Sequence, residues 1–343
     1  MKYSDAVSFR IALETRLNAA AVASQTISAS RLRKLVTLER FLARLLEAAP
    51  GRWVIKGGVA LEFRVPDRAR ATKDLDLWMA DNEESATDGM VQATLVDLHD
   101  YFSFSIERAG RIDADQEGLA IRFRVRAEVA GRQFEIVVVD IGFGEALTRE
   151  PDLVTGCEYL AFADIAPIAV PTLPLDVHVA EKLHAYTRLY TGMLGSSRVK
   201  DLIDLVLISS FAEFSAGELR QSMESSFASR GSHPLPMHLP LPPDDWVTAY
   251  RKLAEEVEFD ANLMAGHHIA ANFLDPVLTG GVRDDARWDP VRGHWRGAED
   301  DPLDRTSFQR DDETFARFSA MLDTPRAPSA ALRHLLRSQA PWE

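Results

Sequence analysis

Two aspartates one residue apart follow a glycine pair in this chain, and residues of these types at this spacing can handle phosphate. The chain runs from Lys56 through Gly57 and Gly58 to Asp74 and Asp76. Residues two apart on a strand point to the same face, so we expect both carboxylates on one side of a sheet. Paired carboxylates bind hard divalent cations, and a glycine turn that opens a helix lets backbone N–H groups approach phosphate. The pattern predicts a metal-dependent site for phosphoryl chemistry.

A third aspartate, Asp140, comes at the end of an apolar run in the context Val139-Asp140-Ile141. If its strand lies beside that of Asp74 and Asp76, it supplies a third metal ligand. Two metal ions about 3.5–4 Å apart would lower the pKa of an attacking hydroxyl and stabilise the attacking and leaving oxygens. Alternate acids also occur on solvated strands, so the glycine pair and Asp140 carry this interpretation.

The elements that must position these residues follow from apolar periodicity. It predicts helices over 4–23, 30–48, 59–65 and 85–100, and strands over 52–56, 74–79, 102–108, 119–129 and 132–141. From about residue 172 helical spacing dominates, over 175–190, 198–211, 215–228, 244–258 and 260–274. Residues 281–310 look like an extended loop before short helices near 312–323 and 328–338.

We therefore expect an α+β fold, a mixed sheet flanked by helices with a second helical domain. The predicted divisions are N-terminal helices packing on the core (1–50), a catalytic domain (51–171), a helical domain (172–280), and an extended loop with C-terminal helices (281–343).

The composition narrows the class of protein. A net charge of −13 argues against a chain that coats nucleic acid through bulk electrostatics. One cysteine, the lack of a signal-peptide pattern and the lack of a long apolar run favour a cytoplasmic protein with no membrane association. On the segment 119–126, Arg122, Arg124 and Arg126 alternate with apolar residues, which predicts a strand with one basic face. That face is either solvated or in contact with phosphate.

These motifs, taken in order, resemble the AbiEii/AbiGii toxin nucleotidyltransferases, the group that includes the MenT toxins. The resemblance spans roughly residues 50–210, and its ordered series is more specific than any single motif. It is carried by Gly57-Gly58-x-Ala60-Leu61, Arg70-x-Thr72-x-Asp74-Leu75-Asp76-Leu77, Val139-Asp140-Ile141, Glu181-Lys182-Leu183-His184-Ala185, and the segment from Arg198 through Asp201 to Asp204.

The resemblance implies a nucleotidyltransferase fold, with a nucleoside triphosphate as substrate and two Mg²⁺ ions as cofactors. It also implies a toxin of a toxin–antitoxin or phage-defence pair, a cognate antitoxin as partner, and the tRNA 3′ end as acceptor, which would block translation. Carried over, Gly57 and Gly58 bind the triphosphate, Asp74 and Asp76 bind metal, and Asp140 completes the metal site.

Lys182 lies on the apolar arc of its predicted helix, with Val179 and Leu183. A lysine there either reaches solvent or an acid with its ammonium, or neutralises a triphosphate. The match to the family motif favours the second role, with Lys182 as a catalytic and nucleotide-binding residue.

Asp201 and Asp204 share one side of an apolar helix, so we expect them to be paired. One could hold Lys182 or Arg198, or orient the acceptor hydroxyl, and Asp201 fits the motif better as a catalytic residue.

Lys56, Arg70 and Thr72 complete the predicted nucleotide-binding set. For two of them a plain structural role is equally open: Arg70 could merely shield the acids, and Thr72 could be an ordinary strand-entry residue.

The expected function is transfer of a nucleoside monophosphate to an acceptor hydroxyl. The alternatives are transfer to a small molecule or a protein hydroxyl, and a non-catalytic nucleotide-binding module.

Overall fold

The sheet has seven strands over the residues that this computed structural model describes, which are 1–24, 27–72, 74–113, 119–144, 147, 149–188 and 198–297. Only β2 with β5 and β1 with β7 pair in parallel, so the sheet is mixed. Its order is β3 (Phe102–Asp113), β4 (Leu119–Val129), β5 (Arg132–Phe143), β2 (Asp74–Met79), β1 (Val54–Lys56), β7 (Ala169–Thr172) and β6 (Asp152–Thr155).

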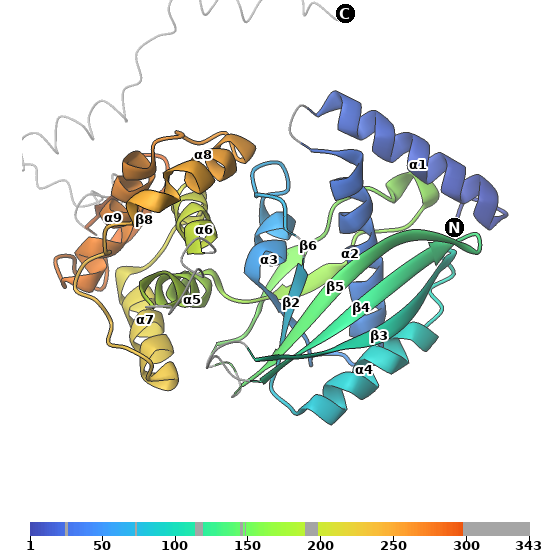
Figure 1. Ribbon diagram of the computed structural model, residues 1–343, viewed down its shortest axis with the longest axis horizontal. Coiled ribbons are helices and arrows are strands. Elements are labelled where there is room, and N and C mark those ends of the chain that lie inside the picture. Colours follow the sequence, from blue (N-terminus) through green and yellow to red (C-terminus); the bar gives the residue numbers. More distant parts are fainter. Residues whose placement is uncertain are drawn as a thin grey trace, which may run out of the picture. The chain divides into compact units, whose positions relative to one another are not determined.

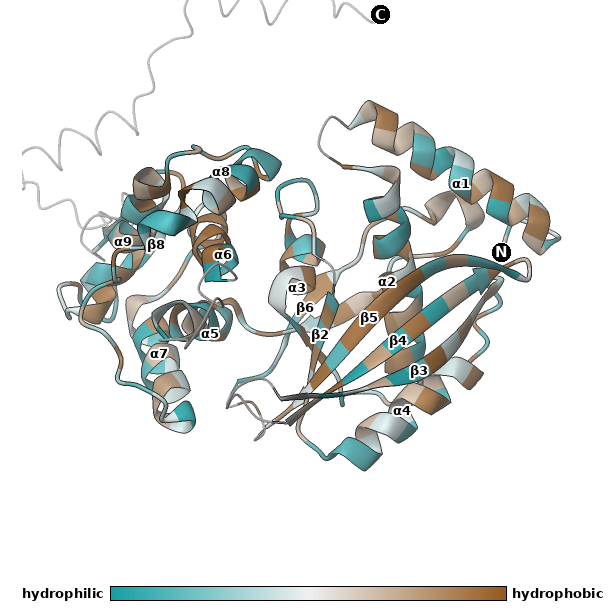
Figure 2. Cartoon of the chain, viewed as in Figure 1, coloured by the Kyte–Doolittle hydropathy of each residue, from teal (hydrophilic) through white to brown (hydrophobic). Residues whose placement is uncertain are grey.

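Helices cover one face of the long strands. In Figure 1, α2 (Ala29–Ala48) runs behind β3, β4 and β5, with α1 (Ala6–Ala23) above these strands and α4 (Glu83–Leu95) below them. α2 buries apolar side chains at helical spacing, among them Leu38, Phe41 and Leu45, in one cluster with the inward residues of the sheet. Figure 2 shows β5 apolar over most of its length. The opposite face of β3 to β5 carries no helix in this view.

The second half of the chain builds its own apolar cluster. It contains α5 (Leu175–Thr187), α6 (Val199–Ser209), α7 (Ala216–Arg230), α8 (Val247–Glu256) and α9 (Leu263–Leu278). α6 is buried on all sides, which explains its nearly continuous apolar sequence. Short 3-10 helices lie at Ala161–Ala163 and Asp244–Trp246. Both halves belong to one compact unit, Met1–Gly297.

The structure departs from the sequence-based expectations in several elements. The strand expected over 102–108 extends to Asp113. The helix expected over 85–100 ends at Leu95. The strands β6 and β7 were not predicted, and each has only four residues, too few for a periodic signal. Residues 281–297 are not a bare loop, because β8 (Arg287–Asp289) and β9 (His294–Arg296) pair there and place Trp288 in the helical cluster.

Some expectations fall outside the described residues, namely the helices near 312–323 and 328–338 and the end of the helix over 175–190. Within the described part of the chain, no helix combines the length and the apolar character needed to cross a membrane.

Candidate active site

The alternation along β2 divides its side chains between two environments. Leu75, Leu77 and Met79 are buried in the core, whereas Asp74 and Asp76 lie only partly buried on the opposite face. This is the face that α1, α2 and α4 leave uncovered, and we call it the open face of the sheet. The prediction that both carboxylates share one side of a strand is confirmed.

A row of charged residues crosses the open face at the level of Asp76. In the strand register, Asp76 is the partner of Asp140 on β5 and of Lys56 on β1, and Asp140 is the partner of Arg122 on β4. Neighbouring strands lie about 5 Å apart, so the two carboxylates are adjacent. The sheet thus places Asp140 beside Asp76, although the two are far apart in the sequence, as the metal-site hypothesis requires.

Gly57 begins α3 (Gly57–Arg64) immediately beside these acids. Its φ of +66° favours glycine, and a Cβ added there would lie 2.0 Å from Oδ2 of Asp76. A Cβ on Gly58 would lie 2.9 Å from the Thr72 hydroxyl. The residue before the helix, Lys56, makes no side-chain capping bond, so the first N–H groups of α3 are available to a ligand. A helix N-terminus with these features suits phosphate.

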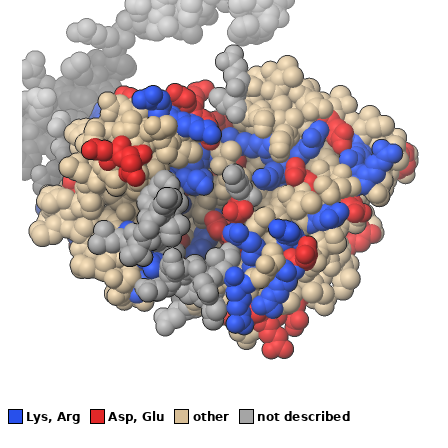
Figure 3. Space-filling model, viewed as in Figure 1, with Lys and Arg blue, Asp and Glu red and all other residues tan. Residues whose placement is uncertain are grey.

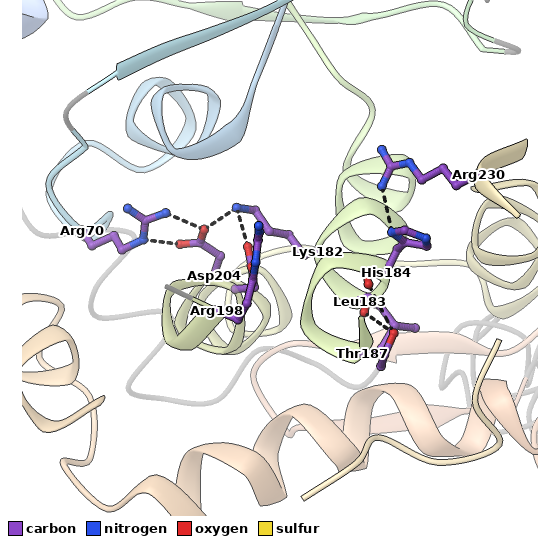
Figure 4. A network of polar contacts seen from close by, with 9 residues as sticks. Arg70, Lys182, Leu183, His184, Thr187, Arg198, Asp204 and Arg230 are labelled. Atoms are coloured by element: carbon purple, nitrogen blue, oxygen red, sulfur yellow. Dashed lines mark hydrogen bonds and ion pairs between the residues drawn. The ribbon is translucent and has the colours of Figure 1, made fainter. Parts of the chain in front are cut away.

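A series of ion pairs links Arg70, in the segment between α3 and β2, to α5 and α6 of the helical half (Figure 4). Arg70 donates to both oxygens of Asp204, with 2.9 Å for each bond. The Lys182 ammonium lies 2.8 Å from Asp204 and 3.1 Å from Asp201, and Asp201 also accepts from Arg198 at 3.3 Å. Asp201 therefore holds both Lys182 and Arg198, as one of the alternatives expected. Orientation of the acceptor hydroxyl by Asp201 stays a prediction.

The charged residues of this network shift one another's pKa values in the direction that keeps each of them charged. Burial would raise the pKa of Asp204, but Arg70 and Lys182 outweigh it and the pKa is lowered. Burial would lower the pKa of Lys182, but Asp204 and Asp201 raise it. Lys182 therefore stays charged, and two of its three N–H donors point to the acids, which leaves one for a ligand.

Asp76 experiences the opposite balance. Burial raises its pKa to about 6, Lys56 and Lys182 offset part of this, and the negative charges of Asp140 and Asp74 add to it. Within the described residues, neither Asp74 nor Asp76 has a side-chain hydrogen bond or ion pair. Negative charge that Lys56 and Lys182 only partly offset suits a divalent cation, so these residues fit the predicted metal.

Asp140, the third acid, differs from Asp74 and Asp76 because an arginine binds it. Asp140 accepts two hydrogen bonds from Arg122, at 2.6 and 2.7 Å. Over the described residues, no three carboxylate, imidazole or thiol groups are gathered closely enough to hold a metal ion as they stand. Metal binding by Asp74, Asp76 and Asp140 stays a prediction.

Sequence reasoning missed two neighbours of the site. Arg122 was seen only as part of a basic strand face, and the strand register that joins it to Asp140 has no local signal. Glu181 lies 3.6 Å from Lys56 and 2.8 Å from Arg230, and the cations hold its pKa at about 2 against the effect of burial. Its place next to Lys182 in the motif was the available signal.

Comparisons with known proteins agree with this geometry. The family model "Nucleotidyl transferase AbiEii toxin, Type IV TA system" matches residues 40–273. None of the curated proteins matches the chain. MenT4, a nucleotidyltransferase toxin from Mycobacterium tuberculosis H37Rv, is similar in structure, with a TM-score of 0.50 and 16% identity, over 79% of this chain and 91% of that one. A putative nucleotidyltransferase from H. pylori gives a TM-score of 0.45 and 15% identity, over 75% and 100%. The MenT4 likeness confirms the expected fold.

Proposed function

The chain belongs to the AbiEii nucleotidyltransferase toxin family, and from this premise we propose that it transfers a nucleoside monophosphate from a nucleoside triphosphate to the tRNA 3′ end. As a member of the family it is a nucleotidyltransferase of a toxin–antitoxin system. Pyrophosphate is the other product. A nucleotide added to the tRNA 3′ end prevents aminoacylation and so arrests translation, and a cognate antitoxin relieves the arrest.

The glycine turn and the ion-pair network support a triphosphate site at the start of α3. The N–H groups at Gly57 and Gly58 donate to its oxygens, since the N-cap residue Lys56 makes no side-chain capping bond to the helix that they begin. Lys182 offers its remaining donor, and the Arg70 guanidinium lies beside the turn, where a Cβ on Gly58 would be 3.4 Å from Nη2. These cations stabilise the charge that develops on the leaving pyrophosphate.

Asp74 and Asp76 would hold Mg²⁺, together with Asp140 once that carboxylate leaves Arg122. When bound, the metal would acidify the acceptor hydroxyl and neutralise charge on the α-phosphate. The protein's own contribution is mainly positioning, because phosphoryl-group transfer demands little covalent chemistry from side chains.

One observation carries the proposal. Within the described residues, the carboxylates of Asp74 and Asp76 accept no hydrogen bond and form no ion pair. Asp76 lies directly beside Gly57, which begins a helix whose N-cap residue makes no side-chain capping bond. A cation site next to a phosphate site is what nucleotide transfer needs, and this arrangement would be costly for a protein without such ligands.

The test is incorporation of label from each of the four α-³²P nucleoside triphosphates, with Mg²⁺ and deacylated bulk tRNA. We expect label in material that RNase digests, at the 3′ terminus. Asp74→Asn and Asp76→Asn should each remove incorporation by at least about a hundredfold. Asp88→Asn, on the exposed side of α4, is the matched control and should retain it.

Two results would overturn the proposal. Label that resists RNase and migrates with protein or with a small molecule would show a different acceptor. Incorporation that survives both active-site substitutions would show that the acids are not the catalytic centre.

A further inference from the structure

The acceptor must approach the site from a definite side. Attack on the α-phosphate is roughly in line with the leaving pyrophosphate, so acceptor and pyrophosphate lie on opposite sides of the α-phosphorus, which in the proposed reaction sits at Asp74 and Asp76. Gly57, Arg70 and Lys182 mark the pyrophosphate side, next to β1 and the helical half. Across β2 from them, the strand register leads to β5 and then to β4. The acceptor therefore lies over β5 and β4.

On β4 and β5, the open face has exposed basic side chains next to apolar ones. Arg124 and Arg126 on β4 are exposed, and in the register they face Val138 and Ile136 on β5. Ile136 is 37% exposed, although it lies in the central region of the sheet. Figure 3 shows the basic side chains gathered on this face beside a small acidic group.

The two arginines have no evident structural task. Within the described residues, no hydrogen bond or ion pair engages either guanidinium. Their register partners on β3 are Glu107 for Arg124 and Ser105 for Arg126, and Glu107 forms no ion pair with Arg124. In a structural strand face, an acid opposite an arginine would be expected to bind it.

The local charge also contrasts with that of the whole chain. The protein carries a net charge of −13, so a polyanion is repelled at long range and attracted only where cations gather. Arginines two residues apart on a strand lie about 7 Å apart and can contact successive phosphates of one strand. The planar guanidinium binds phosphate in a bidentate manner, and apolar side chains between them can carry sugars or bases.

We propose that Arg124 and Arg126, with Ile136 and Val138 between them and the acids, form the surface that binds the phosphate backbone of a nucleic-acid acceptor near its 3′ end. This inference rests on the proposed function, which it deepens by assigning the acceptor's binding surface. A small-molecule or protein acceptor would not need a row of unpaired arginines leading away from the site.

The test compares the Arg124→Gln/Arg126→Gln double variant with wild type and with an Arg251→Gln/Lys252→Gln control, which removes two exposed cations from α8. The probes are a fluorescein-labelled 20-nucleotide single-stranded RNA and bulk deacylated tRNA, titrated at several salt concentrations. Mn²⁺ and nucleoside triphosphate binding are measured in parallel, and thermal unfolding checks the fold.

We expect the double variant to bind both RNAs roughly tenfold more weakly, with a salt slope lower by about 1 to 1.5, because each lost phosphate contact contributes about 0.7. The KM for tRNA should rise while Mn²⁺ and triphosphate affinity stay unchanged. An Arg124→Lys/Arg126→Lys variant should recover most of the binding, since charge is retained.

Three outcomes would overturn the inference: an unchanged RNA affinity and salt slope in the double variant, an equal loss in the control, or no RNA binding by wild type. The outcome for the proposed function is separate. If RNA binding depends on these arginines but no nucleotide is transferred to RNA, the binding surface is supported and the proposed reaction is refuted.

Discussion

Arg122 binds both carboxylate oxygens of Asp140, with Nε 2.7 Å from Oδ1 and Nη2 2.6 Å from Oδ2. The pairing raises the pKa of Arg122, first through these hydrogen bonds. Because Asp140 is adjacent to Asp76 in the register, the arginine occupies a carboxylate that the metal site is expected to use. The Arg122 side chain is 41% exposed, so it can move away into solvent.

This contact predicts that Arg122 competes with the metal. Arg122→Gln frees Asp140 and removes a positive charge near the acids, so we expect Mn²⁺ to bind about fivefold more tightly, equivalent to about 1 kcal/mol. Electron paramagnetic resonance of free Mn²⁺ measures the affinity. Arg124→Gln, on the same strand without a bound acid, is the charge-matched control and should change it less. Equal or weaker binding in Arg122→Gln would contradict competition.

The close approach of Gly57 to Asp76 predicts a specific effect of adding one methyl group. Gly57 and Gly131 share a φ of +66°, but only the first has an obstacle, since nothing lies within 4 Å of a Cβ on Gly131. Gly131→Ala should lower the free energy of unfolding by about 1–2 kcal/mol, the cost of a left-handed alanine. Gly57→Ala should lower the free energy of unfolding by more than Gly131→Ala does, and it should also weaken Mn²⁺ binding, because Asp76 must move. Urea unfolding and Mn²⁺ titration measure both effects, and equal behaviour of the two variants would refute the clash.

For the Arg70–Asp204 pair, we expect removal of one partner to lower the free energy of unfolding more than replacement of both partners by apolar residues. Both side chains are buried, at 7% and 0% exposure. Asp204→Leu leaves Arg70 without its partner and should lower the free energy of unfolding by about 3–5 kcal/mol. The Arg70→Met/Asp204→Leu double variant should recover much of that loss, because no unpaired arginine remains. Guanidinium unfolding at neutral pH gives both values; a double variant no more stable than the single one would contradict this reasoning.

Glu39, which lies away from the candidate site, should make the free energy of unfolding depend on pH. Burial raises its pKa to about 7 from an ordinary value of 4.5, against the smaller effect of Arg40. The folded state therefore binds a proton more tightly than the unfolded state, and the stability of wild type falls as pH rises from 4.5 to 7. Glu39→Gln lacks this loss, so at pH 8 it should be more stable than wild type by about 1–3 kcal/mol. Below pH 4.5 the two proteins should converge. Chemical unfolding across this pH range tests it, and a constant difference would rule out titration of Glu39.

The local pattern of the sequence was enough to predict the centre of the candidate site. Alternation of acids and leucines placed Asp74 and Asp76 on one face, since the side-chain period of a strand does not depend on its surroundings. The glycine pair located the start of α3, because few residues tolerate a left-handed backbone beside a carboxylate. The ordered motifs identified the family and therefore the fold.

Long-range pairing was decided only by the tertiary structure. In the hairpin of β4 and β5, Val129 pairs with Arg132, and an unbroken register would set Arg122 opposite Val139. A bulge between Ala127 and Glu128 shifts the register by one residue, and Arg122 then faces Asp140. Nothing in the local sequence marks that shift.

The partners of Lys182 were likewise beyond the sequence. Periodicity showed that this lysine needed a partner and left solvent, an acid or a triphosphate open, whereas the structure pairs it with both Asp201 and Asp204. Arg70, more than a hundred residues away from Asp204 along the chain, is joined to it by the packing of two halves. The sequence alone was enough to predict which residues carry the chemistry, because residue type and local period are properties of the chain. Only the fold decided which charges neutralise one another, because that depends on distances across the sheet and between helices.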